Sequence, residues 1–284
     1  METKLRNITK AAGKLRILLA DSYSVSPKDA DRTAPSASQA ESEHNASRKK
    51  AHSIAQLESA LSRALTAAAL EIYLGRRPSP EALSGEIRIP GEKPRFPAYP
   101  DFHYNISHSG GVAVCGLSDH PIGIDLQKIP EDTRRIRLIA KRFFSAQEQE
   151  TLQTLHDQNE SEALCRLFCR YWTSRESYIK LTGRGLAESF ENFRPDLEKG
   201  VIQILQCGSP FLTSTESPAK IDIPSGSGNF PESVTSSGNF YLTECPAPKG
   251  YCLTVCSTVP LPSCTVEKLS IPFGEFSSAV VRSD

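Results

Sequence analysis

The sequence has no excess of either charge. Its 284 residues include 33 Lys and Arg against 33 Asp and Glu, so the formal net charge is zero. Such a chain has no overall field that would attract nucleic acid or an anionic membrane, and neither is expected as a partner. Electrostatic recognition by this chain must therefore be local.

A long hydrophobic run is also missing. Residues 1–14 carry charge without an apolar core, and the apolar run at 15–20 is too short for a signal sequence or a membrane span. These features predict a cytoplasmic protein.

The common cofactor motifs are absent too. No GxGxxG or Walker loop occurs, which excludes a typical dinucleotide fold and a P-loop nucleotidase. The eight cysteines form no CxxC pair and have no matching histidines. Buried reduced thiols are therefore favoured over a zinc site.

Hydrophobic residues make up 38% of the chain, enough for a sizeable apolar core. Alternating and helical apolar patterns predict an α+β fold, not a doubly wound sheet. Strands are expected at residues 15–20, 112–117, 122–126, 201–205, 240–245 and 251–257, and helices at 56–74, 134–144, 146–155 and 160–181. Ser145 and Glu148 predict a capping box before the helix at 146–155, and Gly183 predicts the end of the helix at 160–181. The segment between 112–117 and 122–126 predicts a hairpin or a tight turn.

Two segments are poor in apolar residues and predict long loops. They are the Ser- and Ala-rich stretch near 21–47 and the Ser-, Pro- and Gly-rich stretch near 209–238. The expected organisation is an N-terminal α+β half at 1–123, a C-terminal α+β half at 124–260, and a tail at 261–284 without a clear pattern.

The first candidate segment for chemistry is the polar cluster at residues 104–111. It contains Ser107 and His108 and leads directly into a strand. Its backbone donors, hydroxyls and imidazole suit a phosphate. A polar turn with a surface histidine is the alternative interpretation.

The second candidate is Asp125, which lies inside an apolar strand. A buried carboxylate is costly unless it is paired or binds a cation. Strand alternation places Asp125 and Gln127 on one face, with Ile124 and Leu126 on the other. An aspartate that ends an edge strand and points into water is the alternative.

The third candidate is the helical stretch at 172–180. Glu176 and Lys180 are four residues apart and share a face, as an ordinary surface ion pair would. Arg175 falls within the apolar arc, which indicates an anion and a metal near this end of the helix. Together the three segments supply oxygen ligands for Mg²⁺ and cations for phosphate. Residue spacing does not name the phosphate donor.

An ordered set of motifs resembles the surfactin-type 4′-phosphopantetheinyl transferases over residues 57–257. The matching runs are Lys93-Pro94, Tyr104-Asn105-Ile106-Ser107-His108-Ser109, Gly123-Ile124-Asp125, Lys141-Arg142-Phe143-Phe144-Ser145, Trp172-Thr173-Ser174-Arg175-Glu176-Ser177-Tyr178-Ile179-Lys180 and Thr182-Gly183-Arg184-Gly185-Leu186. Each run alone is weak, but their order makes the set specific.

The resemblance implies a pseudo-two-fold monomer of two similar α+β halves, with coenzyme A bound between them. Enzymes of this family move phosphopantetheine from coenzyme A to a serine of an apo acyl or peptidyl carrier protein and release adenosine 3′,5′-bisphosphate. A metal-dependent phosphohydrolase and a non-catalytic coenzyme A-binding protein are the alternatives.

The resemblance also implies roles for single residues. Asp125 and Glu176 would bind Mg²⁺, and Glu176 would accept the proton of the carrier serine. Lys180 would contact the pyrophosphate of coenzyme A and offset charge on the leaving phosphate. The adenosine end would be bound by Ser107, His108, Lys93, the Pro94 backbone and Arg63.

The chain departs from the family pattern at two places. Bacterial relatives commonly carry glutamate where this chain has Gln127, so two carboxylates on the metal are expected, with the Gln127 amide and water completing the site. The family's Gly-Lys-Pro is Gly91-Glu92-Lys93-Pro94 here. The lysines that often grip the adenosine phosphate have only Arg48, Lys49 and Lys50 as candidates.

A basic run offers a surface for an acidic carrier protein. Ile136, Leu138 and Ile139 would add apolar contacts, and a solvated helix with its apolar side in the core is the alternative. The basic residues are Lys128, Arg134, Arg135, Arg137, Lys141 and Arg142.

Overall fold

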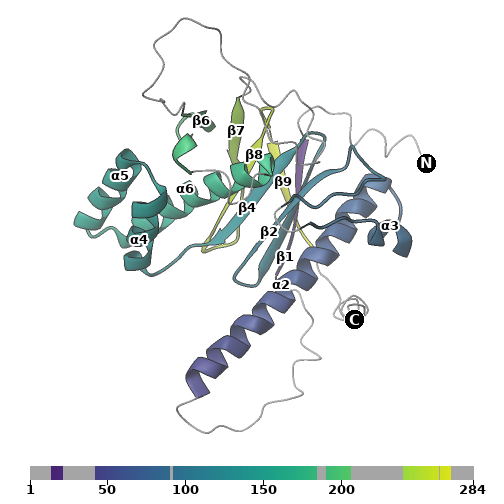
Figure 1. Cartoon of the computed structure of the whole chain (residues 1–284), viewed down its shortest axis with the longest axis horizontal. Helices are drawn as coiled ribbons and strands as arrows, with labels where there is room; N and C mark the ends of the chain where they lie inside the picture. Colours follow the sequence, from purple (N-terminus) through teal and green to yellow (C-terminus); the bar gives the residue numbers. More distant parts are fainter. Residues whose placement is uncertain are drawn as a thin grey trace, which may run out of the picture.

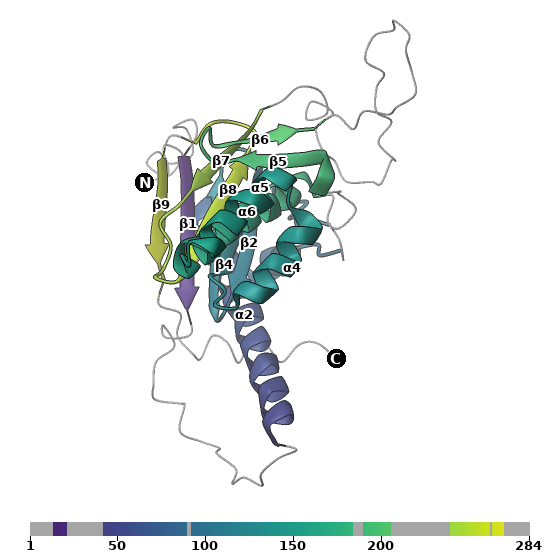
Figure 2. The same cartoon turned by 90° about the vertical axis from the view of Figure 1, so that its left-hand side faces the viewer.

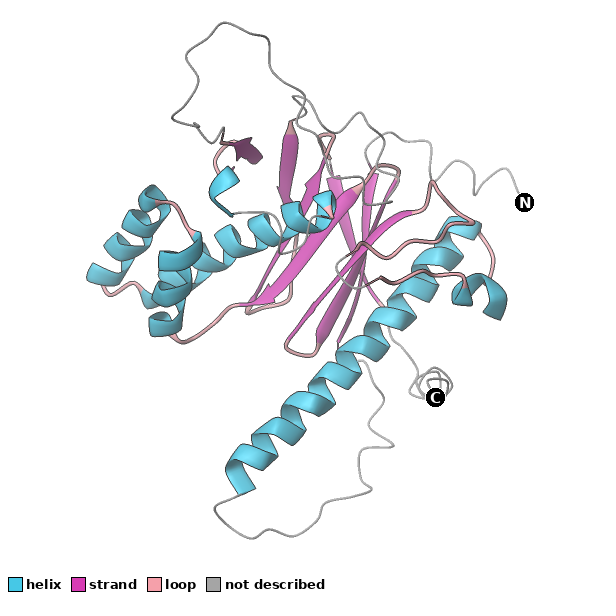
Figure 3. Ribbon diagram, viewed as in Figure 1, coloured by secondary structure: helices cyan, strands magenta, loops and turns pink. Residues whose placement is uncertain are grey.

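Two β-sheets lie between helices in this computed structural model, which confirms the α+β class (Figure 1). The structure describes residues 14–21, 42–89, 92–183, 190–205, 239–261 and 263–269. Most of the two expected long loops and most of the expected tail lie outside these residues. Figure 3 shows the strands between α6 on one side and α2 on the other.

The first sheet has the strand order β2-β3-β1-β9. All neighbours are antiparallel except β1 and β9, which are parallel and lie side by side in Figure 2. Helix α2 packs against this sheet and the short helix α3 follows it. The bounds are β1 Lys14–Asp21, α2 Ser42–Leu74, α3 Pro80–Ser84, β2 His103–Ser109, β3 Val112–Ser118 and β9 Ser263–Lys268.

The second sheet is antiparallel throughout and has the order β4-β8-β7-β6-β5. Helix α6 packs on β4 and β8, and α4 and α5 pack on α6. The bounds are β4 Ile122–Lys128, α4 Thr133–Phe143, α5 Ala146–Asp157, α6 Ser161–Thr182, η4 Phe190–Asn192, β5 Phe193–Asp196, β6 Val201–Ile204, β7 Phe240–Glu244 and β8 Tyr251–Ser257.

The sheets pack face to face around an apolar core. Alternation along β1 divides its side chains, with Leu18 facing α2 and Ile17 and Leu19 facing β4 and β8 of the other sheet. Ile124 and Leu126 of β4 close this central layer. The order of layers is therefore α2, first sheet, second sheet, α6.

Side chains of β2 join the two sheets at one edge. The side-chain oxygens of Asn105, Ser107 and Ser109 accept hydrogen bonds from the backbone N–H groups of β4 residues 124, 126 and 128, at 2.8, 3.0 and 3.1 Å. Every second residue of β2 thus accepts a hydrogen bond from the outward N–H group of every second residue of β4. We call these three contacts the side-chain ladder; they cover an edge that would otherwise have unpaired donors.

Several sequence expectations change here. Of the hairpin or tight turn predicted between 112–117 and 122–126, the hairpin is wrong, because β3 and β4 belong to different sheets and pack face to face instead of pairing. A short turn does join the two strands, since β3 ends at Ser118 and β4 begins at Ile122. The polar cluster at 104–111 is mostly the ordered strand β2. The tail contains β9, and α2 begins at Ser42, well before the expected residue 56.

Predictions that rested on local signals are confirmed. Ser145 and Glu148 form the expected capping box of α5, and Gly183 ends α6 in the left-handed conformation with φ 68°.

Seven cysteines are described as free thiols, while Cys207 lies outside the described residues. No helix in the described part of the chain has the length and apolar composition to cross a membrane.

Gly123 allows α6 to lie directly on β4. A Cβ atom added there would lie 2.0 Å from the carbonyl oxygen of Ser177 and 2.4 Å from the amide nitrogen of Leu181. Both are backbone atoms, so no side-chain rotation could relieve the contact. This close approach brings Glu176 and Lys180 of α6 up to Asp125 of β4.

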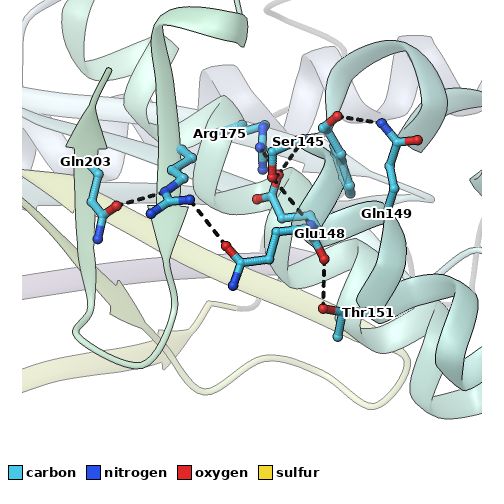
Figure 4. Close-up of polar contacts among 9 residues, drawn as sticks. Ser145, Glu148, Gln149, Thr151, Arg175 and Gln203 are labelled. Carbon is cyan, nitrogen blue, oxygen red and sulfur yellow. Dashed lines mark hydrogen bonds and ion pairs between the residues drawn. The ribbon is translucent and has the colours of Figure 1, made fainter. Parts of the chain in front are cut away.

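A buried ion pair fixes α5 to the opposite side of α6 (Figure 4). Arg175 donates to Glu148 Oε2 at 2.6 Å, and the two side chains are only 1% and 6% exposed. The guanidinium also lies over the Phe144 ring, 4.5 Å from its centroid. The anion that the sequence predicts beside Arg175 is therefore the chain's own Glu148, and Arg175 lies away from the metal candidates.

The Gly123 contact gives a first prediction. Gly123→Ala should lower the free energy of unfolding by about 3 kcal/mol, since α6 must move away from β4 to make room. Urea denaturation measures the change. Gly85→Ala is the matched control, because Gly85 is exposed with φ −74° and the nearest atom would be 3.3 Å away. Equal stability of the two variants would contradict the account.

The buried pair gives a second prediction. Arg175→Ala leaves the Glu148 carboxylate buried without a counter-charge and should cost about 3–5 kcal/mol in chemical denaturation. The double variant Arg175→Met/Glu148→Leu removes both charges and should recover much of that loss. A double variant as unstable as the single one would show that the charges are not the cause.

Candidate active site

Asp125 is held at the edge where the two sheets meet. Its Oδ1 atom accepts hydrogen bonds from the Ser107 hydroxyl at 2.9 Å and the Lys180 ammonium at 2.6 Å. Lys180 also donates to Ser107 Oγ at 2.9 Å. One strand of each sheet and one helix therefore contribute to a single polar cluster.

The other carboxylate oxygen of Asp125 has no partner. Oδ2 is buried without a hydrogen bond. An unpaired buried carboxylate oxygen is costly, and a cation is the kind of ligand that would satisfy it.

Glu176 lies one helical turn before Lys180 and is half-buried. Burial raises the pKa of its carboxyl, the negative charge of Asp125 raises it further, and Lys180 opposes both effects. Two carboxylates thus lie close enough to affect each other electrostatically, with one ammonium in the same cluster. Because this leaves an excess of negative charge, the arrangement suits a divalent cation.

Gln127 lies on the same face of β4 as Asp125, nearer the end of the strand. Its amide nitrogen donates to the Lys128 carbonyl oxygen at 3.2 Å, which leaves the amide oxygen as the atom available to a ligand. Among the described residues, no group of three or more His, Cys, Asp and Glu side chains could hold a metal. Asp125 and Glu176 would hold the ion, with Gln127 as a neutral neighbour.

His108 points to the opposite face of β2 from Ser107. Its Nδ1 atom lies 3.0 Å from Glu58 Oε2, and Glu58 Oε1 accepts the Gly111 N–H at 2.9 Å. Ser107 therefore contacts the carboxylate cluster, whereas His108 lies beside α2.

A cavity of about 230 Å³ adjoins His108. Tyr104 and Ile106 line it from the same face of β2, and the unpartnered buried hydroxyl of Ser62 comes from α2. The complete lining is Ser59, Ser62, Arg88, Pro94, Tyr104, Asn105, Ile106 and His108.

The structure separates the remaining sequence candidates. Pro94 lines the cavity, and Arg63 donates to the lining residue Ser59 at 2.9 Å. Lys93 instead donates to the Ile122 carbonyl oxygen at 2.6 Å, and burial lowers the pKa of its ammonium to about 8.

Other sequence candidates have no described side chains. Arg48, Lys49 and Lys50 lie on α2 in a part where only the backbone is described, and residues 184–189 lie outside the description altogether.

Three residues near this cavity were not predicted from the sequence: Glu58, Ser62 and Arg88. Glu58 had a usable signal, because it precedes the buried Leu61 and Leu65 by three and seven residues and so falls on the inner face of α2. Arg88 lies between the predicted helix at 56–74 and the polar cluster at 104–111, where no helix or strand is expected, and nothing local distinguishes it.

The chain is similar in sequence to known 4′-phosphopantetheinyl transferases. Residues 121–231 match the family model described as the 4′-phosphopantetheinyl transferase superfamily. A 4′-phosphopantetheinyl transferase of Bacillus subtilis is 43% identical over 36% of this chain and 42% of its own length. The 4′-phosphopantetheinyl transferase Sfp of Bacillus subtilis strain 168 is 34% identical over 50% of this chain and 63% of its own.

A third relative, the 4′-phosphopantetheinyl transferase psf-1 of Bacillus pumilus, is 37% identical over 38% of this chain and 43% of its own length. The matched regions thus span between 42% and 63% of these three relatives. The resemblance that the motifs indicated is confirmed: the chain is similar to surfactin-type 4′-phosphopantetheinyl transferases, and the superfamily match lies in residues 121–231.

Proposed function

We propose that this chain transfers 4′-phosphopantetheine from coenzyme A to a serine of an apo acyl or peptidyl carrier protein, with Mg²⁺. The observation that carries the proposal is the Asp125 carboxylate, held by Ser107 and Lys180 with one buried oxygen unpartnered beside Glu176. The relatives are named for this transferase activity, which supports the same reaction here.

Asp125 and Glu176 would hold the Mg²⁺ ion. The donor set fits, because carboxylate oxygens are preferred ligands of Mg²⁺ and Asp125 Oδ2 lacks any other partner. When bound, the ion would neutralise charge on the pyrophosphate of coenzyme A. The prediction of two carboxylate ligands, with Gln127 and water beside them, follows from the residues present.

Lys180 and Glu176 would carry the proton and charge changes. The carrier serine oxygen attacks the phosphorus that bears the pantetheine arm, and the bond from this phosphorus to adenosine 3′,5′-bisphosphate breaks. Glu176 accepts the serine proton, a role that needs its carboxyl ionised. The Lys180 ammonium, 28% exposed, offsets the charge that develops on the leaving phosphate.

The cavity beside His108 would take the adenosine end of coenzyme A. Arg88 and His108 supply donors for a phosphate, and Pro94 and Ile106 supply apolar wall. Strand β2 connects this cavity with the carboxylate cluster, because its side chains alternate: His108 lines the cavity and Ser107 contacts Asp125.

A mass measurement tests the reaction. Wild-type protein with Mg²⁺ and coenzyme A should add one phosphopantetheine group to an apo carrier. Asp125→Asn or Glu176→Gln should lower the transfer rate by at least about 100-fold, since each loses a charge that faces the reacting phosphates. Glu162→Gln is the matched control, because its side chain lies on the same helix and is 89% exposed.

The same assay separates the alternative functions. Release of phosphate or hydrolysis of coenzyme A without carrier would indicate a phosphohydrolase. Tight coenzyme A binding with no mass change on any carrier would indicate a non-catalytic binding protein. Either outcome would overturn the transferase proposal. The cytoplasmic location and monomeric state stay predictions.

Helix α4 offers the surface for the carrier. Its outer face exposes arginines and Leu138, which is 72% exposed. Ile136 is buried in the core and Ile139 packs against the same cluster, so of the three expected apolar contacts only Leu138 is fully open. Exposed basic residues of this surface are Lys128, Arg134, Arg135, Arg137, Lys141 and Arg142.

Charge reversal tests this surface. The double variant Arg134→Glu/Arg135→Glu should raise the KM for an acidic carrier about tenfold and leave coenzyme A affinity unchanged. Steady-state kinetics at low ionic strength measure both. Arg76→Glu, an exposed residue just beyond α2, is the control. Unchanged carrier kinetics in the double variant would rule out docking on α4.

A further inference from the structure

Glu58 is a buried carboxylate with no place in the roles assigned so far. Its residue is 8% exposed on the inner face of α2. Both oxygens are engaged, Oε2 by His108 Nδ1 at 3.0 Å and Oε1 by the Gly111 N–H at 2.9 Å. Burying a charged carboxylate costs free energy, which these two contacts must offset.

The contact with Glu58 determines what His108 can bind. A carboxylate only accepts hydrogen bonds, so Nδ1 carries the proton, and Nε2 is the nitrogen left for a ligand at the cavity. In the neutral ring Nε2 would be an acceptor and could not bind a phosphate oxygen. Anion binding therefore needs an N–H at both ring nitrogens, with Nδ1 directed at Glu58 and Nε2 available to the ligand.

The other charged groups at the cavity are arranged for the same ligand. Arg88 lines the cavity and donates through Nε to Glu86 Oε2 at 2.8 Å. Glu86 also accepts the Tyr104 hydroxyl, which fixes it against β2. Ser62 adds a buried hydroxyl without a partner. The Arg88 guanidinium, the His108 ring and the unpartnered Ser62 hydroxyl all line the cavity, and this combination favours a phosphate monoester.

We propose that Glu58 is a positioning residue, which holds His108 so that Nε2 of the ring binds a phosphate monoester of the donor nucleotide. The second bond of Glu58, to Gly111, fixes the turn between β2 and β3 and thereby the end of the strand that carries His108. The identity of the nucleotide rests on the proposed function.

Calorimetry with two ligands tests this role. Coenzyme A and dephospho-coenzyme A differ only in the 3′-phosphate monoester. Wild-type protein should prefer coenzyme A, because only this ligand carries the phosphate that the His108 ring would bind. Glu58→Gln should weaken coenzyme A binding about tenfold and leave dephospho-coenzyme A binding unchanged, which removes the preference.

Further variants separate positioning from folding. Gln can still accept the Gly111 N–H, and Glu58→Asp, which keeps the charge, should restore part of the preference. Glu71→Gln, an exposed position on the same helix, should behave as wild type. Adding His108→Gln to Glu58→Gln should cause little additional loss, because both act on one contact.

The outcomes distinguish this inference from the function on which it rests. Equal loss of affinity for both ligands in Glu58→Gln, or a preference for coenzyme A as strong as in the wild type, would overturn the positioning role alone. Failure of the wild-type protein to bind coenzyme A would overturn both proposals.

Discussion

The side-chain ladder between β2 and β4 is the contact on which the rest of the site depends. Two sheets that meet at an edge usually leave backbone donors unpaired, yet here Asn105, Ser107 and Ser109 accept them one by one. Ser107 does more than seal the edge, because the same hydroxyl orients Asp125 and receives Lys180. The contact that joins the two sheets therefore also sets the positions of the reactive groups. The other face of β2 carries His108.

Helix α6 carries two ion pairs with opposite characters. Arg175 and Glu148 lie almost entirely out of solvent and join α5 to α6, and the guanidinium stacks on Phe144. Glu148 Oε1 and two guanidinium nitrogens of Arg175 have no further partner, but they are enclosed between helices, so this pair has a structural role. Lys180 lies five residues after Arg175 and pairs with Asp125 of β4, whose Oδ2 has no partner. Because the Lys180 side chain is 28% exposed and Glu176 adds a second carboxylate nearby, this second pair is the one that suits a ligand.

The sequence predicted features that a short stretch of residues decides. The capping box of Ser145 and Glu148 and the stop at Gly183 are local, and α5 and α6 appear where expected. β9 pairs with β1, far away along the chain, whereas β2 pairs with the neighbouring β3 but is too polar to resemble a strand. Asp125 and Lys180 were recognised as candidates, but their direct contact was not, because it follows from the absence of a side chain at Gly123. Glu58 needed the position of β2 before its role could be seen.

The pairing of β9 with β1 has a consequence for the order of folding. Arg16 and Glu267, which form an ion pair between these strands, are 251 positions apart. The first sheet therefore cannot be completed until nearly all of the second half has been synthesised, and that half can fold around α6 beforehand. Closing so long a loop is entropically slow, and contacts of this separation are typical of late folding steps. One edge of β1 is thus unpaired during synthesis, and it is protected from pairing with other strands only once β9 has been made.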